Sequence, residues 1–375
     1  MRVATVVLAV AVMAAAAAAM RSVEIKHESE YPFERYVRDF GKNYDAHEYV
    51  RAFKTYSENV AKIARHNADA RQTYRKGVNK FTDMDAAARK RFLGFSMAKK
   101  LSDYVEARAP TTEEVPAVPL EALPKSVDWR NKKNPSVITP VKDQASCGSC
   151  WAHAATEQVE YAVAIATNTL SPLSRQNIVD CAPNPDHCGG TGGCEGATAE
   201  LGFAYVKDKG MASEAAYPYT GMDGTCDESI PKSGQVNGWV VLPSNNYTAV
   251  VTAVANVAPL AITVAADTWF DYSSGVFTGC GTDTDLNHAV QLVGYGTQGS
   301  QDYWIVRNSW SAGWGEAGYI RILKHSDGSS QWCGIDTTPG DGTGCENGPS
   351  QVTVCGSCGI LYDVCWATGG SIPQF

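Results

Sequence analysis

All twelve cysteines of this 375-residue chain lie at or after Cys147. In a chain routed for secretion, cysteines gathered in one segment predict a domain held together by disulfides. The segment that begins at Cys147 must therefore fold as a cross-linked unit. The first third of the chain must fold without such cross-links, which predicts a separate role for it.

The amino-terminal residues 1–20 predict a signal peptide. The segment reads MRVATVVLAVAVMAAAAAAM, with one arginine followed by an apolar run and Ala-x-Ala sites. An amino-terminal membrane anchor is the alternative, because the run approaches the roughly 17–25 residues that a span needs. Its alanine content favours cleavage. We therefore expect the secretory pathway, with a lysosome, a vacuole or the cell exterior as the destination.

The charge balance excludes two classes of partner. The net charge is −8 and the isoelectric point is near 5.4, whereas nucleic-acid grooves and anionic membranes require a basic field. We therefore expect no nucleic-acid partner and, after signal cleavage, no membrane. The carboxylate excess suits an acidic compartment.

The chain before Leu123 has the pattern of a removable segment. Apolar residues recur every three or four positions between Asp45 and Asn67, which predicts an amphipathic helix. Residues 104–124 hold four prolines and four glutamates, a composition that stays extended and open to proteases. We predict a prosegment over 21–122 and a mature domain over 123–375. The apolar stripe of the helix consists of Tyr49, Phe53, Tyr56, Val60 and Ile63.

The mature part predicts an α+β fold. Residues 149–166 place alanines and valines on one helical face, and short apolar runs separated by turn signals follow after Gly238. A helical half followed by a β half predicts a site in the cleft between them.

Cys150 is the strongest candidate for a reactive group. In QASCGSCWA it stands where a turn enters the helix, and the helix dipole there favours the thiolate. A thiolate nucleophile also needs a proton donor in a fixed orientation. His288 begins an apolar strand and suits that role, whereas His153 shares the helix of Cys150 and is poorly placed.

Two further polar residues complete the candidate site. Asn308 could accept a hydrogen bond from one ring nitrogen of His288, with Trp310 shielding that bond from water. Gln144 could aim an N–H, beside that of Cys150, at an oxygen that becomes negative during acyl transfer.

The motifs QASCGSCWA, LNHAVQLVGYG and RNSWSAGWG together resemble the papain-like cysteine proteases of the cathepsin type. Trp151 completes the family signature that begins at Cys147. The resemblance implies a two-lobed fold and a cysteine endopeptidase made as a zymogen, working through an acyl-enzyme thioester. It implies no cofactor and no metal, protein or peptide substrates, the chain's own prosegment as an intramolecular inhibitor, and a monomer.

The resemblance extends into the prosegment. Glu48, Asn59, Ile63 and Asn67 match the family's helical motif, while Ala52 and Tyr56 replace its arginine and phenylalanine. The stretch GVNKFTD supplies the second motif, with Gly77, Asn79, Phe81 and Asp83.

The same resemblance implies three disulfides: Cys147–Cys194, Cys181–Cys226 and Cys280–Cys333. Five cysteines remain, so at least one is unpaired or bonded outside the chain, and a zinc site is the rival interpretation. The second CGSC, at 355–358, lacks a following helix, a tryptophan and an upstream glutamine, which predicts a structural role. It belongs to a tail, 338–375, that is atypical of the family. The five remaining cysteines are Cys188, Cys345, Cys355, Cys358 and Cys365.

Two smaller predictions concern binding and modification. Gly196 resembles the family's segment that pairs with extended substrate, with Ala197 where a second glycine is usual. Asn246 lies in a glycosylation sequon. The alternative functions are a thiol-disulfide oxidoreductase that uses Cys147 and Cys150, and a catalytically inactive binding protein on the same fold.

Overall fold

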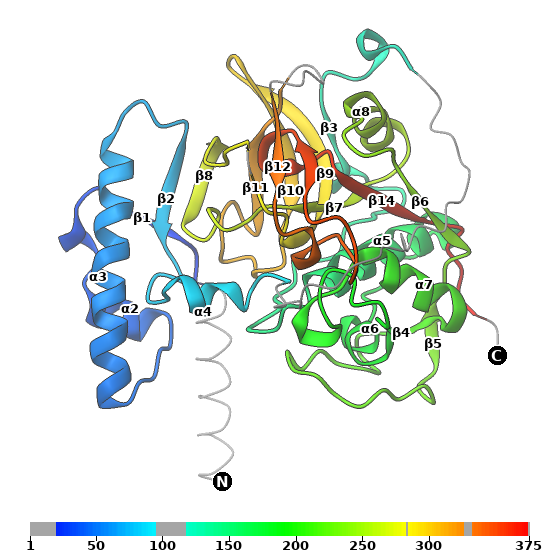
Figure 1. Ribbon diagram of the computed structural model, residues 1–375, viewed down its shortest axis with the longest axis horizontal. Coiled ribbons are helices and arrows are strands. Elements are labelled where there is room, and N and C mark those ends of the chain that lie inside the picture. The colour runs from blue at the N-terminus through cyan, green and yellow to red at the C-terminus, as the bar shows by residue number, and fades with distance from the viewer. Residues whose placement is uncertain (1–19, 95–117, 283, 326–331, 374–375) are drawn as a thin grey trace.

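The computed structural model describes residues 20–94, 118–282, 284–325 and 332–373. The predicted signal peptide and most of the predicted linker lie outside these ranges. A prosegment packs against one side of a larger domain made of a helical lobe and a β lobe (Figure 1). Within the described ranges, no helix has the length and apolar character to cross a membrane.

The prosegment is built around one long helix. Helix α3 spans Ala46–Ala68 and begins at Asp45, whose side chain accepts the N–H groups of His47 and Glu48. The predicted helix is confirmed. The other prosegment elements are β1 (Val23–Glu24), η1 (Glu28–Glu30), α2 (Phe33–Asp39), β2 (Tyr74–Val78) and α4 (Ala86–Lys90).

The predicted apolar stripe of α3 is only partly buried. Tyr56, Val60 and Ile63 lie in the prosegment core, but Tyr49 and Phe53 remain 39% and 49% exposed. The small α2 covers only part of this end of α3, so these two rings pack edge-on against Phe33 and keep one face in water.

The helical lobe surrounds α5 (Cys150–Thr167), which confirms the predicted helix. Its residues from Cys150 to Ala164 are all buried, because other helices pack on one side and the β lobe on the other. The neighbouring helices are α6 (Arg175–Cys181) and α7 (Ala199–Lys209).

The β lobe is one twisted sheet in the order β1-β2-β8-β11-β10-β9-β7-β14-β6, with β3 also pairing with β9. The prosegment extends this sheet, because β2 pairs antiparallel with β8. Helix α8 (Tyr247–Asn256) covers it, and exposed Asn246 caps that helix through its side chain. The strands that the domain contributes to this sheet are β3 (Val127–Asp128), β6 (Gly238–Val241), β7 (Leu260–Val264), β8 (Tyr272–Phe277), β9 (His288–Gln298), β10 (Gln301–Arg307), β11 (Tyr319–Leu323) and β14 (Asp363–Thr368). Two separate two-stranded sheets pair β4 (Met211–Ala212) with β5 (Lys232–Gly234) and β12 (Cys333–Asp336) with β13 (Val352–Cys355).

Five disulfides cross-link the domain. Cys147–Cys194 and Cys181–Cys226 agree with the prediction. The predicted Cys280–Cys333 bond was wrong, because Cys280 pairs with Cys358 and Cys333 with Cys355. The fifth bond is Cys188–Cys345.

The misassignment of Cys280 has a structural cause. The motif CGI occurs at both Cys333 and Cys358, and the distance from β11 favoured the first. Strands β12 and β13 instead form a hairpin between the two motifs, which brings Cys358 beside Cys280. Both cysteines of the second CGSC are therefore structural, as predicted. The tail is not an appendage, since β14 lies inside the main sheet.

Candidate active site

Cys150 is the first residue of α5 and lies outside all five disulfides. Burial raises the pKa of its thiol to about 11, while nearby backbone N–H groups, that of Ala289 foremost, act in the opposite direction. Its side chain is 2% exposed. Burial therefore disfavours the thiolate in this closed form, and exposure to water would favour it.

His288 and Asn308 meet as predicted. The His288 Nε2–H donates to Asn308 Oδ1 at 2.8 Å, and the backbone N–H of Ser309 donates to the same oxygen. This fixes the tautomer, so Nδ1 carries the lone pair, and that atom is buried without a hydrogen-bond partner. Burial lowers the pKa of His288 to about 4, an effect that the Asn308 bond partly offsets.

Trp310 covers this pair. Its ring stacks on the imidazole of His288 with centroids 4.9 Å apart, and it is fully buried. The predicted shielding by Trp310 therefore has a geometric basis. Trp151 lies elsewhere, where its indole N–H donates to Gly193 O at 3.0 Å and holds the loop before Gly196.

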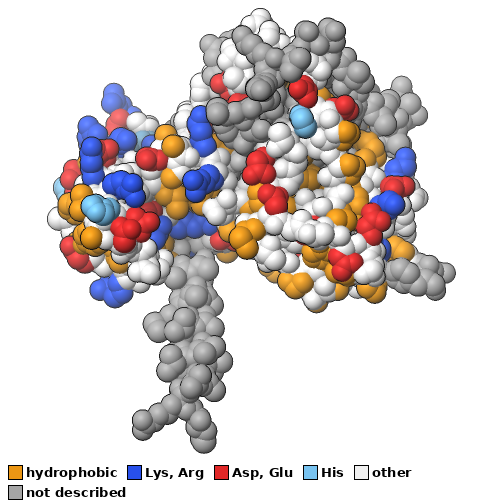
Figure 2. Space-filling view, turned by 60° about the horizontal axis from the view of Figure 1, so that its bottom comes forward, with side chains coloured by type: hydrophobic (Ala, Val, Ile, Leu, Met, Phe, Trp, Pro, Cys, Tyr) orange, Lys and Arg blue, Asp and Glu red, His pale blue; other side chains and the backbone are white. Residues whose placement is uncertain are grey.

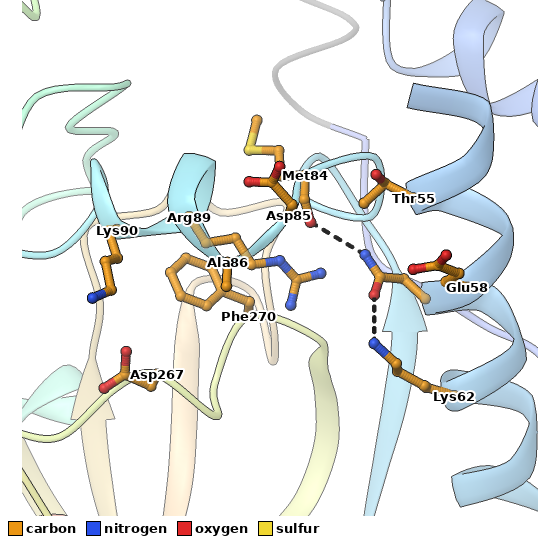
Figure 3. A pocket seen from close by; sticks show the side chains of 11 residues that line it. Thr55, Glu58, Lys62, Met84, Asp85, Ala86, Arg89, Lys90, Asp267 and Phe270 are labelled. Carbon is orange, nitrogen blue, oxygen red and sulfur yellow. Dashed lines mark hydrogen bonds between the residues drawn. The ribbon is translucent and has the colours of Figure 1, made fainter. Parts of the chain in front are cut away.

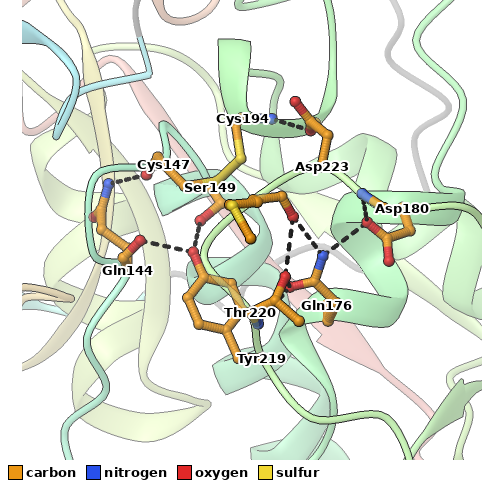
Figure 4. The surroundings of a disulfide bond; sticks show 12 residues. Gln144, Cys147, Ser149, Gln176, Asp180, Cys194, Tyr219, Thr220 and Asp223 are labelled. Carbon is orange, nitrogen blue, oxygen red and sulfur yellow. Dashed lines mark hydrogen bonds between the residues drawn. A yellow bond between two sulfur atoms is a disulfide. The ribbon is translucent and has the colours of Figure 1, made fainter.

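Gln144 lies next to the Cys147–Cys194 disulfide (Figure 4). Its side-chain N–H group donates to Cys147 O at 2.9 Å and to Phe92 O of the prosegment at 3.1 Å. Its Oε1 accepts the Ser309 hydroxyl at 2.5 Å. The Gln144 side chain is thus oriented with its N–H group directed at the Phe92 carbonyl oxygen of the prosegment.

The other histidines of the domain have local partners. The Nδ1–H of His153 donates to Ser149 O at 2.9 Å, one turn back on its own helix. His187 pairs with Glu346, and His325 stacks on Trp332.

Comparison with known proteins decides the family. The model of the papain family of cysteine proteases matches residues 123–341, and that of the cathepsin propeptide inhibitor domain matches residues 33–87. The chain belongs to the papain family. The match ends at Asp341, so the chain from Gly342 onward lies beyond it.

Relatives extend over both parts of this papain-family chain. Fruit bromelain from Ananas comosus is 35% identical over 312 residues, which cover 82% of this chain and 84% of that protein. The solved recombinant stem bromelain precursor is 34% identical with a TM-score of 0.71, covering 90% of this chain and 97% of that one. Digestive procathepsin L 3 of Tenebrio molitor is 32% identical with a TM-score of 0.67, covering 91% and 97%. The protein is accordingly a cysteine endopeptidase synthesised with an inhibitory propeptide domain.

The prosegment of this papain-family protein runs through the candidate site. The N–H of Gly94 donates to Asn287 O at 2.8 Å. A Cβ added to Gly94 would lie only 3.2 Å from Cys150 Sγ. The Phe92 carbonyl also accepts the indole N–H of Trp310 at 3.1 Å. No motif in the sequence predicts these contacts, because Phe92 and Gly94 follow the two prosegment motifs.

The predicted substrate segment borders the same place. A Cβ on Gly196 would lie 2.5 Å from Gly94 O, and one on Gly148 would lie 2.9 Å from Leu93 O. Only glycine permits so close a backbone approach at these positions, and Gly196 also has a φ of +89°. The prosegment therefore lies against the segment predicted to bind substrate.

Specific contacts hold the prosegment on the domain. Phe270 and Trp310 stack on each other, and Phe81 packs edge-on against both rings at centroid distances of 5.1 and 5.3 Å. Asn79 donates to Phe270 O. Lys80 forms an ion pair with Asp143. Figure 3 shows the groove of about 370 Å³ between α3, α4 and the loop that carries Phe270.

A cluster of four buried charged side chains connects helix α5 to the segments that carry Gln144 and Asn308. Lys142 contacts Glu160 at 2.7 Å and Arg307 contacts Glu157 at 3.3 Å, with all four side chains almost fully buried. Lys142 and Arg307 lie near Gln144 and Asn308 in sequence, while the glutamates lie on α5 behind Cys150. This cluster was not predicted, although Glu157 and Glu160 within an otherwise apolar helix are a signal for it.

Proposed function

We propose that Cys150 is the nucleophile of this cysteine protease and that His288 is its general acid and base. The observation that carries the proposal is the imidazole of His288, whose Nε2–H is bound to Asn308 while its buried Nδ1 has no partner. The backbone N–H of Ala289, the residue after His288, interacts with Cys150 Sγ and lowers the pKa of its thiol.

In the proposed reaction the Cys150 thiolate attacks the peptide carbonyl carbon. Gln144 Nε2–H and the backbone N–H of Cys150 stabilise the resulting oxyanion. The His288 imidazolium then gives its proton to the leaving amine, the C–N bond breaks, and a thioester remains. Water attacks the thioester with His288 as the base, which releases the acid and restores the thiolate.

Asn308 and Trp310 orient the imidazole in this proposal, and Gly196 with Ala197 pairs with the acyl side of the substrate. The substrates are proteins or peptides. The proposed precursor consists of a signal peptide over 1–20, a prosegment over 21–122 that is cut near Leu123, and a monomeric mature domain over 123–375. Five disulfides support passage through the secretory pathway to a lysosome, a vacuole or the cell exterior. Asn246 remains the proposed glycosylation site.

One observation weighs against the oxidoreductase alternative. Cys147 is bonded to Cys194 and is therefore not the redox partner of Cys150.

A labelling experiment tests the proposal. We expect a thiol-directed epoxide to modify the acid-processed protein once, at Cys150, and His288→Ala to slow this modification strongly. Cys150→Ser should abolish peptide hydrolysis without unfolding the domain. Cys365→Ser is the matched control, because Cys365 is also buried and outside the disulfides, and it should retain labelling and activity. Hydrolysis near the wild-type rate in Cys150→Ser would refute the assignment.

A further inference from the structure

The segment between β12 and β13, residues 337–351, crosses from the β lobe to the helical lobe, and we call it the bridging loop (Figure 1). Most of it, from Gly342 onward, lies beyond the residues that match the papain family. Its contacts extend to residues on both walls of the proposed substrate cleft.

The first end of the bridging loop is fixed to the β lobe. Thr337 donates to the Asp285 carboxylate through its backbone N–H at 2.8 Å and its hydroxyl at 3.1 Å. Just before the loop, Asp336 accepts the Leu286 N–H at 3.0 Å. These contacts place the start of the loop against the chain that leads into His288.

The far end is fixed to the helical lobe. Cys345 is bonded to Cys188, and the N–H of Gly189 donates to Gly344 O at 2.8 Å. Glu346 pairs with His187 at 2.9 Å. A covalent bond and several polar contacts therefore hold the loop across the two lobes.

Gly342 lies between the two walls. A Cβ atom added to Gly342 would overlap Leu286 O. A Cβ atom added to Gly189 would lie 2.7 Å from Gly342 O and 3.0 Å from Ala197 O. Gly342 is buried. Backbone from the loop thus fills the space between Leu286 on one wall and the Gly189–Ala197 region on the other.

Gly94 of the prosegment occupies the neighbouring space. It lies between Asn287 and Gly196, the residues next to Leu286 and Ala197, and it contacts Cys150. The prosegment chain then leads back through Phe92, towards Gln144 and Trp310. The cleft therefore continues on the Gln144 side of Cys150 and is narrowed by the bridging loop on the Gly196 side.

We propose that the bridging loop limits the acyl side of the cleft to one or two substrate residues. An extended residue advances a chain by about 3.3 Å, so a third residue on that side would have to displace a disulfide-bonded loop. The mature protease then prefers peptide bonds near the amino terminus of its substrates over bonds in the interior. This inference rests on the proposed function, which assigns Gly196 and Ala197 to the acyl side.

The test measures kcat/KM on a length series. The substrates are acetylated peptides with one, two, three or four residues before an aminocoumarin, so that charge stays constant while length changes. We expect kcat/KM of the processed wild-type protein to fall at least tenfold from two residues to three. In the double variant Cys188→Ser, Cys345→Ser the fall should shrink to less than threefold. Cys181→Ser with Cys226→Ser is the matched control, since it removes a disulfide of the helical lobe outside the loop, and it should keep the fall.

A second measurement needs no variant. The processed wild-type protein is given a twenty-residue peptide with a free amino terminus, and the first products are identified by mass spectrometry. We expect the first cuts within two residues of the amino terminus. First cuts in the interior, or a kcat/KM that does not fall with length, would overturn the inference while leaving the proposed function intact. Absence of all hydrolysis together with unlabelled Cys150 would instead refute the proposed function.

Discussion

The prosegment and the protease domain are stabilised in opposite ways. Residues 21–94 carry sixteen basic and eleven acidic side chains and no cysteine, whereas residues 123–375 carry twelve basic, twenty-four acidic and twelve cysteines. In Figure 2 the blue side chains gather mainly over the prosegment, and red ones spread over the domain. The domain is cross-linked covalently, while the prosegment is held by aromatic packing, hydrogen bonds and charge.

This difference explains how one chain can contain both a stable enzyme and a removable inhibitor. Acid weakens attraction between opposite charges as carboxylates take up protons, but it leaves disulfides intact. Lower pH should therefore release the prosegment and preserve the domain. The predictions below test the two sides of this comparison separately.

Phe81 is the most important apolar contact of the prosegment with the domain. Replacing a buried phenylalanine with alanine costs about 3–5 kcal/mol, so Phe81→Ala should weaken docking at least a hundredfold. We expect the rate of epoxide labelling of Cys150 in the intact zymogen at neutral pH to rise accordingly. Phe53→Ala, at a ring that is 49% exposed, is the control and should change the rate little.

Glu157→Ala should lower the stability of the protease domain and leave the binding of the prosegment unchanged. Glu157→Ala would leave Arg307 buried without its carboxylate, and breaking a buried pair in this way costs about 3–5 kcal/mol. Urea unfolding of a Cys150→Ser zymogen would measure the loss. Glu228→Ala removes an exposed carboxylate and should change the free energy of unfolding by less than about 0.5 kcal/mol. Equal effects of the two substitutions would contradict the proposed role of the cluster.

The ion pair of Lys80 with Asp143 should make prosegment release depend on pH. A hydrogen bond to a charged partner is worth about 1.5–3 kcal/mol, and this one disappears when the carboxylate is protonated. We expect wild-type activation to accelerate as pH falls from neutral to about 4.5, because acid protonates carboxylates and weakens the attraction between opposite charges. Lys80→Gln should activate faster at neutral pH and show a flatter profile. Activation that is independent of pH in the wild type would refute this.

Glu200 should make the stability of the domain depend on pH. Burial raises the pKa of Glu200, and neighbouring Asp363 raises it further. The unfolded chain releases this proton near pH 4.3 and the folded chain retains it to higher pH, so the free energy of unfolding falls as pH rises above about 4.3. Glu200→Gln should remove most of that fall, because one pKa unit corresponds to about 1.4 kcal/mol. Denaturation at pH 4 and pH 7 would measure it, and an unchanged difference would contradict this explanation.

The sequence predicted the parts of the molecule that follow local rules. The helix that begins at Cys150 follows from its alanines and apolar spacing, and the position of His288 follows from the apolar strand that begins at this residue. The pairing of His288 with Asn308 was predicted from the hydrogen-bonding chemistry of an asparagine amide, although His288 begins β9 and Asn308 follows β10.

The remaining features depend on long-range packing. Tyr49 and Phe53 continue the helical stripe but extend past the surface that α2 covers. The partner of Cys280 depended on a hairpin inserted between two identical CGI motifs. The bridging loop became apparent only when Gly342 was found between residues that are distant in sequence, and no pattern in the sequence predicts that position.

The central claim is that the prosegment holds Cys150 and His288 as a neutral, inaccessible pair, and the pH profile of Cys150 alkylation tests it most directly. Iodoacetamide rates should be measured from pH 4 to pH 10 on the zymogen and on the processed protein. We expect the zymogen to react slowly and only at high pH, in line with a thiol pKa of about 11, and the processed protein to react fast already in mild acid when His288 is present. Equal rates and equal profiles for the two forms would contradict the claim.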